Sequence, residues 1–213
     1  MNWLIDTLGS SIGKKLMMAL TGLAFCGFLV AHLAGNMTIL AGPDAFNRYA
    51  ETLKGLGVIV ILLEIGLIAF AVIHIFTGMT LFYQNLKARP VRYSVNKSAG
   101  GRTIGSATMP YTGILLLFFV IIHLLNFTFV DKTGTTIWQI VSSAFERPAY
   151  IIFYIASMIV VAVHVSHGLW SAFQTIGANH PKYMPAIWVL SITFALAIGI
   201  GFGMLPIYFS ISA

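Results

Sequence analysis

Four histidines of this chain lie deep inside long, almost uncharged stretches. They are His32, His74, His123 and His164. The stretch between Arg147 and Lys182 holds His164 and contains no Asp, Glu, Lys or Arg. A run of this length can cross a bilayer, and an ionisable group inside it indicates a functional site. Imidazole is a common ligand for iron. Gly168 follows His164 by one helical turn on the same face, which leaves room for a flat group such as a metalloporphyrin.

Helix direction sorts the four histidines into two pairs. If successive spans alternate in direction, His32 and His123 lie about 20–25 Å from the starting side of the membrane. His74 and His164 then lie about 25 Å from the opposite side, so the two levels are about 10–15 Å apart. The inner pair also shares a local pattern, a histidine followed four residues later by Gly78 or Gly168.

Two bis-imidazole haem sites, stacked across a bilayer, would form a path for electrons. The pairs predict His32 and His123 as ligands of an outer haem, and His74 and His164 as ligands of an inner haem. A simpler alternative is that each histidine bonds a neighbouring helix. That alternative is less favoured because the four histidines occur one to a span and pair by depth.

The composition predicts the elements that must hold these side chains. Of the 213 residues, 58% are hydrophobic and 8% are charged, and the mean hydropathy is +0.90. Soluble domains carry about 25% charged residues. We therefore expect an all-α integral membrane protein, a single five-helix bundle over residues 1–213. The apolar runs, which carry no charged residue apart from Glu64, place its spans at about 16–40, 57–86, 109–130, 148–177 and 184–209. Pro110, Pro148 and Pro185 fall at predicted helix starts.

Charge predicts the orientation of the bundle. One side of the membrane receives Lys14, Lys15, Lys87, Arg89, Arg92, Lys97, Arg102 and Lys182. By the positive-inside rule the N-terminus is cytoplasmic and the C-terminus is outside. The net charge of +6 therefore requires no nucleic acid. The basic loop from Lys87 to Thr108 could bind anionic lipid or the acidic face of a docked protein.

The remaining composition excludes several classes of site. The single cysteine, Cys26, rules out an iron–sulfur cluster, an internal disulfide and c-type haem attachment in this chain. Five spans leave no room for a separate soluble domain of ordinary size. Any soluble chemistry therefore belongs to a partner.

Glu64 is a carboxylate inside an apolar run, and it is expected at the level of the outer histidines. A buried carboxyl holds its proton more tightly than one in water, which suits a group that takes protons from a quinol. The alternative is a buried structural carboxyl bonded to loop amides. Further candidate quinone contacts at that level are Asn36, Thr38, Trp138 and Gln139.

Two further histidines have less defined roles. His167, about 60° round the helix from His164, is a candidate partner for a haem propionate or a quinone, or the ligand itself if the register differs. His180 lies in a predicted turn and is expected to be solvated, although a quinone site at the cytoplasmic edge would be within its reach.

Four sequence blocks resemble a known family. They are LVAHLAGN around His32, AFAVIHIFTG around His74, FFVIIHLLN around His123 and VHVSHGLWSAFQTIG around His164. They are similar to the single-chain, five-helix, di-haem cytochrome b subunit of succinate:quinone and quinol:fumarate oxidoreductases. The resemblance runs over nearly the whole chain and is most specific in the last block.

The resemblance implies two haem b groups with the histidine pairs given above. It also implies menaquinone as the quinone, a bacterial cytoplasmic membrane, and two cytoplasmic partners, an iron–sulfur subunit and an FAD-containing flavoprotein that interconverts succinate and fumarate. The chain would be the quinone-reactive subunit and would carry no dicarboxylate chemistry. Similar chains carry Asn at the position of His167, which favours His164 as the ligand. Glu64 lies near a carboxylate that the family uses at its outer quinone site.

One departure from the family bears on proton movement. Some quinol:fumarate reductases carry a Glu where this chain has Ala162, and their transmembrane proton path uses it; its absence puts such a path in doubt here. The direction, succinate oxidation or fumarate reduction, stays open. Two alternatives remain: a cytochrome b anchor of another complex, such as a hydrogenase or formate dehydrogenase, and a haem-free proton-coupled transporter.

Overall fold

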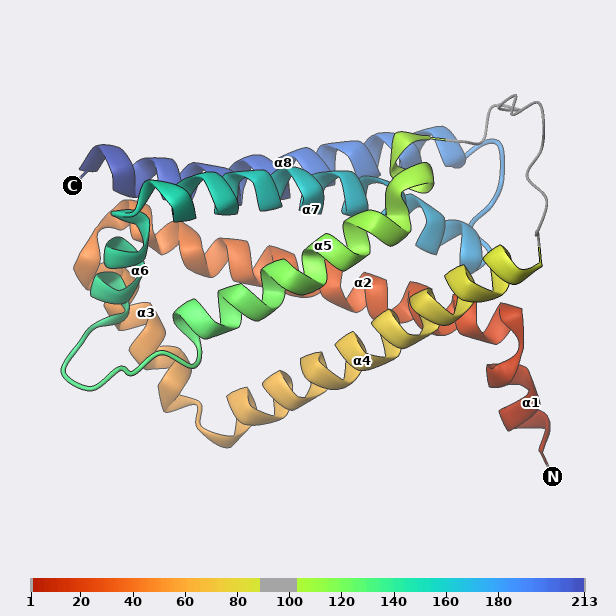
Figure 1. Cartoon of the computed structure of the whole chain (residues 1–213), viewed down its shortest axis with the longest axis horizontal. Coiled ribbons are helices and arrows are strands. Elements are labelled where there is room, and N and C mark those ends of the chain that lie inside the picture. Colours follow the sequence, from red (N-terminus) through yellow and green to blue (C-terminus); the bar gives the residue numbers. More distant parts are fainter. Residues whose placement is uncertain (1, 89–102, 213) are drawn as a thin grey trace.

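The computed structural model describes residues 2–88 and 103–212, and helices dominate this part of the chain (Figure 1). The helices are α1 (Trp3–Gly9), α2 (Ser11–Asn36), the 3₁₀ helix η1 (Met37–Ala41), α3 (Pro43–Gly55), α4 (Val58–Lys87), α5 (Ile104–Phe127), α6 (Ile137–Phe145), α7 (Pro148–Thr175) and α8 (Met184–Ser212). Of the predicted basic loop, Arg89, Arg92, Lys97 and Arg102 lie outside the described residues.

Five of these helices are long and apolar enough to cross a membrane. They cover Ser11–Ala41, Val58–Lys87, Ile104–Phe127, Pro148–Thr175 and Met184–Ile211. Large apolar side chains are exposed along their outer faces, such as Ile61, Val72 and Phe118. Lipid tails solvate such faces as well as a protein core does. The predicted all-α fold with five apolar spanning helices is confirmed.

Capping residues set helix starts that charge alone does not reveal. Ser10 accepts a hydrogen bond from the backbone N–H of Gly13, so α2 begins before its two lysines. Thr103 and Ser106 form a reciprocal capping box that starts α5 at Ile104. Pro110 therefore lies inside α5, and its predicted place at a helix start is wrong. Pro148 does begin α7.

Two helices that the apolar runs did not predict, α3 and α6, lie together at one end of the bundle (Figure 1). Each buries apolar side chains, Phe46 from α3 and Val141 and Phe145 from α6. These side chains join Tyr154 of α7 and Phe209 of α8 in one hydrophobic cluster. The end that the charge pattern predicts to be outside is therefore closed by packed aromatic side chains.

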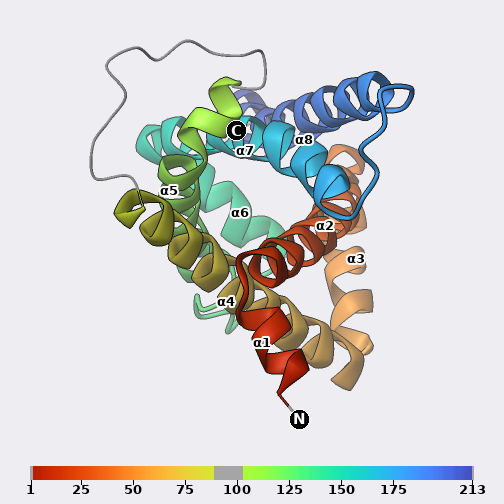
Figure 2. The same ribbon diagram turned by 90° about the vertical axis from the view of Figure 1, so that its right-hand side faces the viewer.

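Helices α2, α4, α5 and α7 surround a common interior, and α8 lies outside this ring, mainly against α7 (Figure 2). Small residues allow the close approach of α8. A Cβ atom added to Gly199 would lie 2.9 Å from Cβ of Ala162 and 3.3 Å from the Met158 carbonyl oxygen. Ala195 is 3% exposed. The small residues of α8 therefore allow it to pack closely against α7.

We expect Gly199→Leu to lower the free energy of unfolding by about 1–3 kcal/mol, because the larger side chain has to separate α7 from α8. Thermal unfolding of the detergent-solubilised protein measures this change. Ile200→Ala is the matched control, since Ile200 is the next residue and is 58% exposed. Equal unfolding midpoints for Gly199→Leu and wild type would contradict the packing assigned to this glycine.

Candidate functional site

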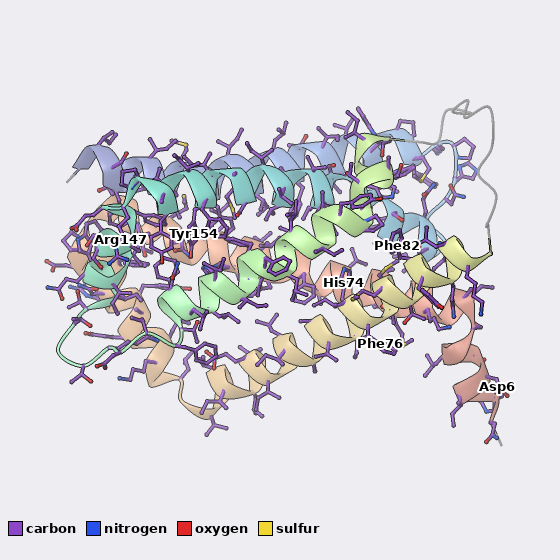
Figure 3. The ribbon with its side chains drawn as sticks, viewed as in Figure 1. Asp6, His74, Phe76, Phe82, Arg147 and Tyr154 are labelled. Carbon is purple, nitrogen blue, oxygen red and sulfur yellow. The ribbon has the colours of Figure 1, made fainter. Side chains whose placement is uncertain are left out.

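The structure brings the four span histidines together in two pairs. The rings of His32 on α2 and His123 on α5 have centres 6.0 Å apart, with an angle of 87° between their planes. The rings of His74 on α4 and His164 on α7 have centres 6.5 Å apart, at 63°. These are the pairs that the depth argument predicted. Figure 3 places His74 within the bundle, between Arg147 at the α6 end and Asp6 on α1 at the other end.

The separation within each pair fits two imidazoles on opposite sides of one metal ion. Metal–imidazole bonds are about 2.0–2.1 Å long, and a ring nitrogen lies about 1.1 Å from its ring centre, so the two centres are about 6.3 Å apart. The observed 6.0 and 6.5 Å bracket this value. The angle between the planes is free, because each ring can turn about its metal–nitrogen bond.

The donor set favours haem over a bare metal ion. Within residues 2–88 and 103–212, no group of three or more His, Cys, Asp or Glu side chains could hold an ion. Each pair therefore supplies two nitrogen ligands and no more. Haem iron takes four ligands from its porphyrin and needs only axial ones from the protein. The residues present thus fit haem b at both levels.

The two inner rings are held through Nδ1 by neighbouring helices. Nδ1 of His74 lies 3.1 Å from Oγ1 of Thr21 and 3.1 Å from the carbonyl oxygen of Met18, both on α2. Nδ1 of His164 lies 3.0 Å from Oγ1 of Thr112 on α5. In the part of the chain that the structure describes, no hydrogen bond involves Nε2 of either ring. Nε2 is therefore the nitrogen available to a metal.

The outer rings are held mainly by aromatic packing. Phe28 stacks on His32 with ring centres 5.1 Å apart, and Phe119 lies 5.6 Å from His123. Nδ1 of His123 is buried and has no hydrogen-bond partner among the described residues. Asn36 lies at the end of α2, where its amide donates to the His32 carbonyl oxygen at 2.8 Å. The same amide nitrogen is 3.5 Å from Nδ1 of His32, at the limit of a hydrogen bond.

The two predicted glycines lie beside methionines that flank the inner pair. A Cβ atom on Gly78 would be 3.7 Å from the sulfur of Met18, and one on Gly168 would be 4.0 Å from Cε of Met109. Both positions have ordinary contact distances to a flexible side chain. A flat group could therefore displace the methionine and lie against the glycine.

His167 lies at a site separate from the two histidine pairs. It lines a cavity of about 190 Å³ together with Trp170, Trp188 and the start of α5. Its Nδ1 atom is buried and finds no partner among the described side chains. A role toward a propionate or a quinone stays a prediction. His180 is exposed, and its Nδ1 accepts a hydrogen bond from the Lys182 backbone at 3.2 Å, as expected for a loop residue.

The expected burial of Glu64 is wrong: its side chain is exposed on α4. Helix α4 packs on α2 and, over a shorter stretch, on α5, so much of its surface has no protein neighbour in the described chain. Trp138 packs on Phe209 with ring centres 4.9 Å apart, which makes it part of the core. Thr38 bonds to the Gly35 carbonyl oxygen.

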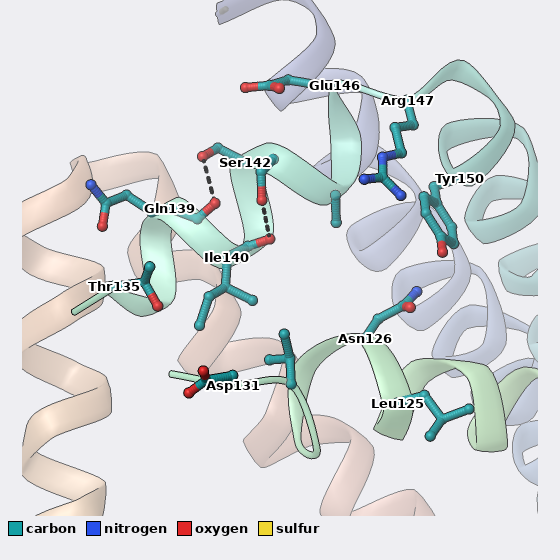
Figure 4. Close-up of a pocket in the computed structure, with 13 residues that line it drawn as sticks. Leu125, Asn126, Asp131, Thr135, Gln139, Ile140, Ser142, Glu146, Arg147 and Tyr150 are labelled. Carbon is teal, nitrogen blue, oxygen red and sulfur yellow. Dashed lines mark hydrogen bonds between the residues drawn. The ribbon is translucent and has the colours of Figure 1, made fainter. Parts of the chain in front are cut away.

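Gln139 lines a larger cavity of about 580 Å³ between α5, α6 and α7 (Figure 4). This volume is in the range of small-molecule sites. Asn126 also lines the cavity and donates to the Tyr154 hydroxyl at 3.2 Å. The ring of Tyr154 is 6.1 Å from that of His123. The cavity is thus separated from the outer pair by one layer of side chains.

A hydrogen bond lowers the proton affinity of Asp131, a carboxylate at this cavity. The backbone N–H of Thr133 donates to Oδ1 of Asp131 at 2.9 Å, which lowers the pKa of that carboxyl. Asp131 is therefore a weak base for a proton released by a quinol. Glu146 also lines the cavity.

Sequence reasoning missed Thr21, Thr112, Asn126 and Tyr154. A hydroxyl or an amide in an apolar run usually bonds its own helix, so residue type alone gave no signal. The signal that could have identified the threonines is the identical Thr-Gly dipeptide eleven residues before His32 and eleven before His123.

Two curated proteins are similar to this chain. A 66-residue segment, 31% of the chain, is 39% identical to the succinate dehydrogenase hydrophobic membrane anchor subunit of Halobacterium salinarum and spans 50% of that protein. Over 155 residues, 70% of the chain, it is 26% identical to the succinate dehydrogenase cytochrome b558 subunit of Bacillus subtilis and spans 72% of that protein. No protein-family model and no solved structure matches the chain.

These similarities and the five apolar helices agree with the resemblance predicted from the histidine blocks. The chain is therefore similar to a membrane-anchor subunit and a cytochrome b558 subunit of succinate dehydrogenase, and five of its described helices are long and apolar enough to span a membrane.

Proposed function

We propose that this chain anchors a succinate dehydrogenase or fumarate reductase in the membrane. It would pass electrons between a quinone and a cytoplasmic head through two haem b groups. The family resemblance favours menaquinone as the quinone. The observation that carries the proposal is the pair of facing imidazoles at each of two levels, with ring centres 6.0 and 6.5 Å apart. The similarity to a cytochrome b558 subunit supports haem b as the cofactor.

The histidines would hold the two groups by Nε2, His32 and His123 at the outer level and His74 and His164 at the inner one. Haem b bound there supplies one-electron chemistry. Gly78 and Gly168 leave space against the backbone of α4 and α7 for the flat macrocycle.

A quinone would react on the outer side. Glu64 and Tyr154 each lie ten residues before an inner histidine, on helices that run in the same direction. Because the Tyr154 ring contacts that of His123, the matching position of Glu64 is at the level of the outer pair. An exposed carboxylate at that depth can accept a proton from a quinol bound on the α4 face. The larger cavity, which Asn126 and Gln139 line, is a second location with room for the quinone ring.

The opposite end of the bundle would face the head. Of the twelve Lys and Arg residues, the sequence assigns eight to this side, including Lys14, Lys15, Lys87 and Lys182. The α3 and α6 end receives Arg48, Lys54, Lys132 and Arg147, together with the acidic residues Asp44, Glu51, Asp131 and Glu146. This supports a cytoplasmic N-terminus. The partners would be an iron–sulfur subunit and an FAD-containing flavoprotein that carries out the dicarboxylate chemistry, and the membrane would be the cytoplasmic membrane of a bacterium.

Replacing His164 by Ala should lower the haem content from two to one per chain, since a bis-imidazole site that loses one ligand binds haem weakly. Pyridine haemochrome assay of the purified complex measures the count. His180→Ala is the control and should keep both haems. If His164→Ala keeps two haems and His167→Ala loses one, His167 is the ligand instead of His164. Absence of haem from the wild-type protein would refute the proposed function.

Changing Glu64 to Gln should lower quinone-linked kcat by about 10²-fold or more, because a positioned base usually contributes ~10²–10⁴-fold. Both haems should stay in place. Glu51→Gln, an exposed carboxylate change on α3, is the control. Normal turnover of Glu64→Gln together with a raised KM in Asn126→Leu would place the quinone in the outer cavity instead.

The orientation is testable with single cysteines placed at exposed lysines in a Cys26→Ala background. A membrane-impermeant maleimide should label Lys132→Cys in intact cells, and Lys182→Cys only after the membrane is opened, because the basic end faces the cytoplasm. Labelling in the opposite order would reverse the proposed topology.

A further inference from the structure

The threonines beside the inner histidines are oriented as hydrogen-bond acceptors. The Thr21 hydroxyl is 2.7 Å from the Met17 carbonyl oxygen, and the Thr112 hydroxyl is 3.1 Å from that of Thr108. Each hydroxyl proton is therefore donated to the threonine's own helix, which leaves the oxygen to accept a proton from the imidazole. Both inner rings then carry hydrogen on Nδ1 and a free electron pair on Nε2.

The two threonines occupy the same place in a repeated stretch of sequence. Residues 18–32 read MALTGLAFCGFLVAH, and residues 109–123 read MPYTGILLLFFVIIH. Met, Thr, Gly, Phe and His recur at matching positions, and each stretch ends at a histidine of the outer pair. Thr and His are eleven residues apart, which is three helical turns within about 20°, so both lie on one helix face.

The contacts made by the two stretches also match. A Cβ atom on Gly22 would be 3.3 Å from Cε1 of His74, and one on Gly113 would be 3.6 Å from Cε1 of His164. The glycine after each threonine thus makes room for the edge of the ring that the threonine holds. Met18 and Met109, at the start of the stretches, lie against Gly78 and Gly168, one turn after the inner histidines.

We propose that Thr21 and Thr112 are positioning residues, which fix the tautomer and the orientation of the inner histidine pair and tune its donation to iron. The inference rests on the proposed function. The helices that carry the outer ligands therefore also orient the inner ones. An imidazole whose N–H is hydrogen-bonded is a more basic ligand, and hydrogen bonds around a haem are one of the protein's means of setting its potential.

The effect should be confined to one haem. Neither outer ring has a hydroxyl at Nδ1: His123 has no partner there among the described residues, and His32 has only the Asn36 amide at 3.5 Å. The two threonines should also differ in the size of their effect on the inner haem. His74 keeps the Met18 carbonyl oxygen as a second acceptor, whereas Thr112 provides the hydrogen bond recorded for Nδ1 of His164.

The test is a redox titration of the α band, with EPR of the low-spin ferric haems, on the purified complex carrying Thr112→Val or Thr21→Val. We expect an upward shift of one midpoint potential and of one EPR signal, with the other haem unchanged. The shift should be larger for Thr112→Val than for Thr21→Val. Thr112→Ser restores the hydroxyl and should restore the wild-type potential.

Thr77→Val is the matched control. Thr77 is as buried as the other two threonines, and it bonds only to carbonyl oxygens of α4, those of Ile73 and His74. Both potentials should stay at their wild-type values in this variant. Wild-type potentials in Thr112→Val with two haems bound would overturn the inference while leaving the proposed function intact. If Thr112→Val loses a haem, recovery of that haem in Thr112→Ser supports the inference, and loss in both variants overturns it.

Discussion

The organisation of this chain depends on imidazole pairs that face each other inside hydrocarbon. A polar ring in a lipid-embedded helix is costly unless it faces the bundle interior and finds a partner there. Each of the four histidine helices must therefore be rotated so that its ring points inward, and each must be shifted along its axis so that two rings meet. These two requirements explain why α2, α4, α5 and α7 form the ring and α8, whose sequence contains no histidine, stands outside it.

The packing around the ring is uneven, and it follows from residue size. Gly199 and Ala195 let α8 approach α7 closely, and α7 also contacts α2 and α5. Helix α7 is thus enclosed on several sides and carries many of the buried residues. At the α3 and α6 end, Phe145, Tyr154 and Phe209 fill the space between helices. The outer histidines therefore rest against an aromatic core, whereas the inner ones rest against threonine hydroxyls.

Much of this arrangement could be predicted from the sequence, because counting residues gives depth. Apolar runs with at most one charged residue located the five apolar helices, and the position of each histidine within its run gave the two levels at which rings meet. Counting residues does not give the neighbours of a helix face. Glu64 and Tyr154 are equivalent in depth, yet Tyr154 is buried and Glu64 is exposed, because α7 has protein on several sides and α4 does not. The start of α5 and the helices α3 and α6 depend on capping side chains and local amphipathicity, which apolar runs do not record.

The low burial of α4, the least enclosed of the five spanning helices, has a consequence for how such a chain is made. This helix packs on α2 and α5, and it meets α7 through the ring of His74 opposite that of His164. A cofactor bound between those rings would hold α4 against α7 and so complete the bundle. Biogenesis should then proceed in two stages, with a partly associated intermediate that awaits its prosthetic group. When haem supply is short, that intermediate would expose the second span to quality-control proteases, so the abundance of the subunit would follow haem synthesis.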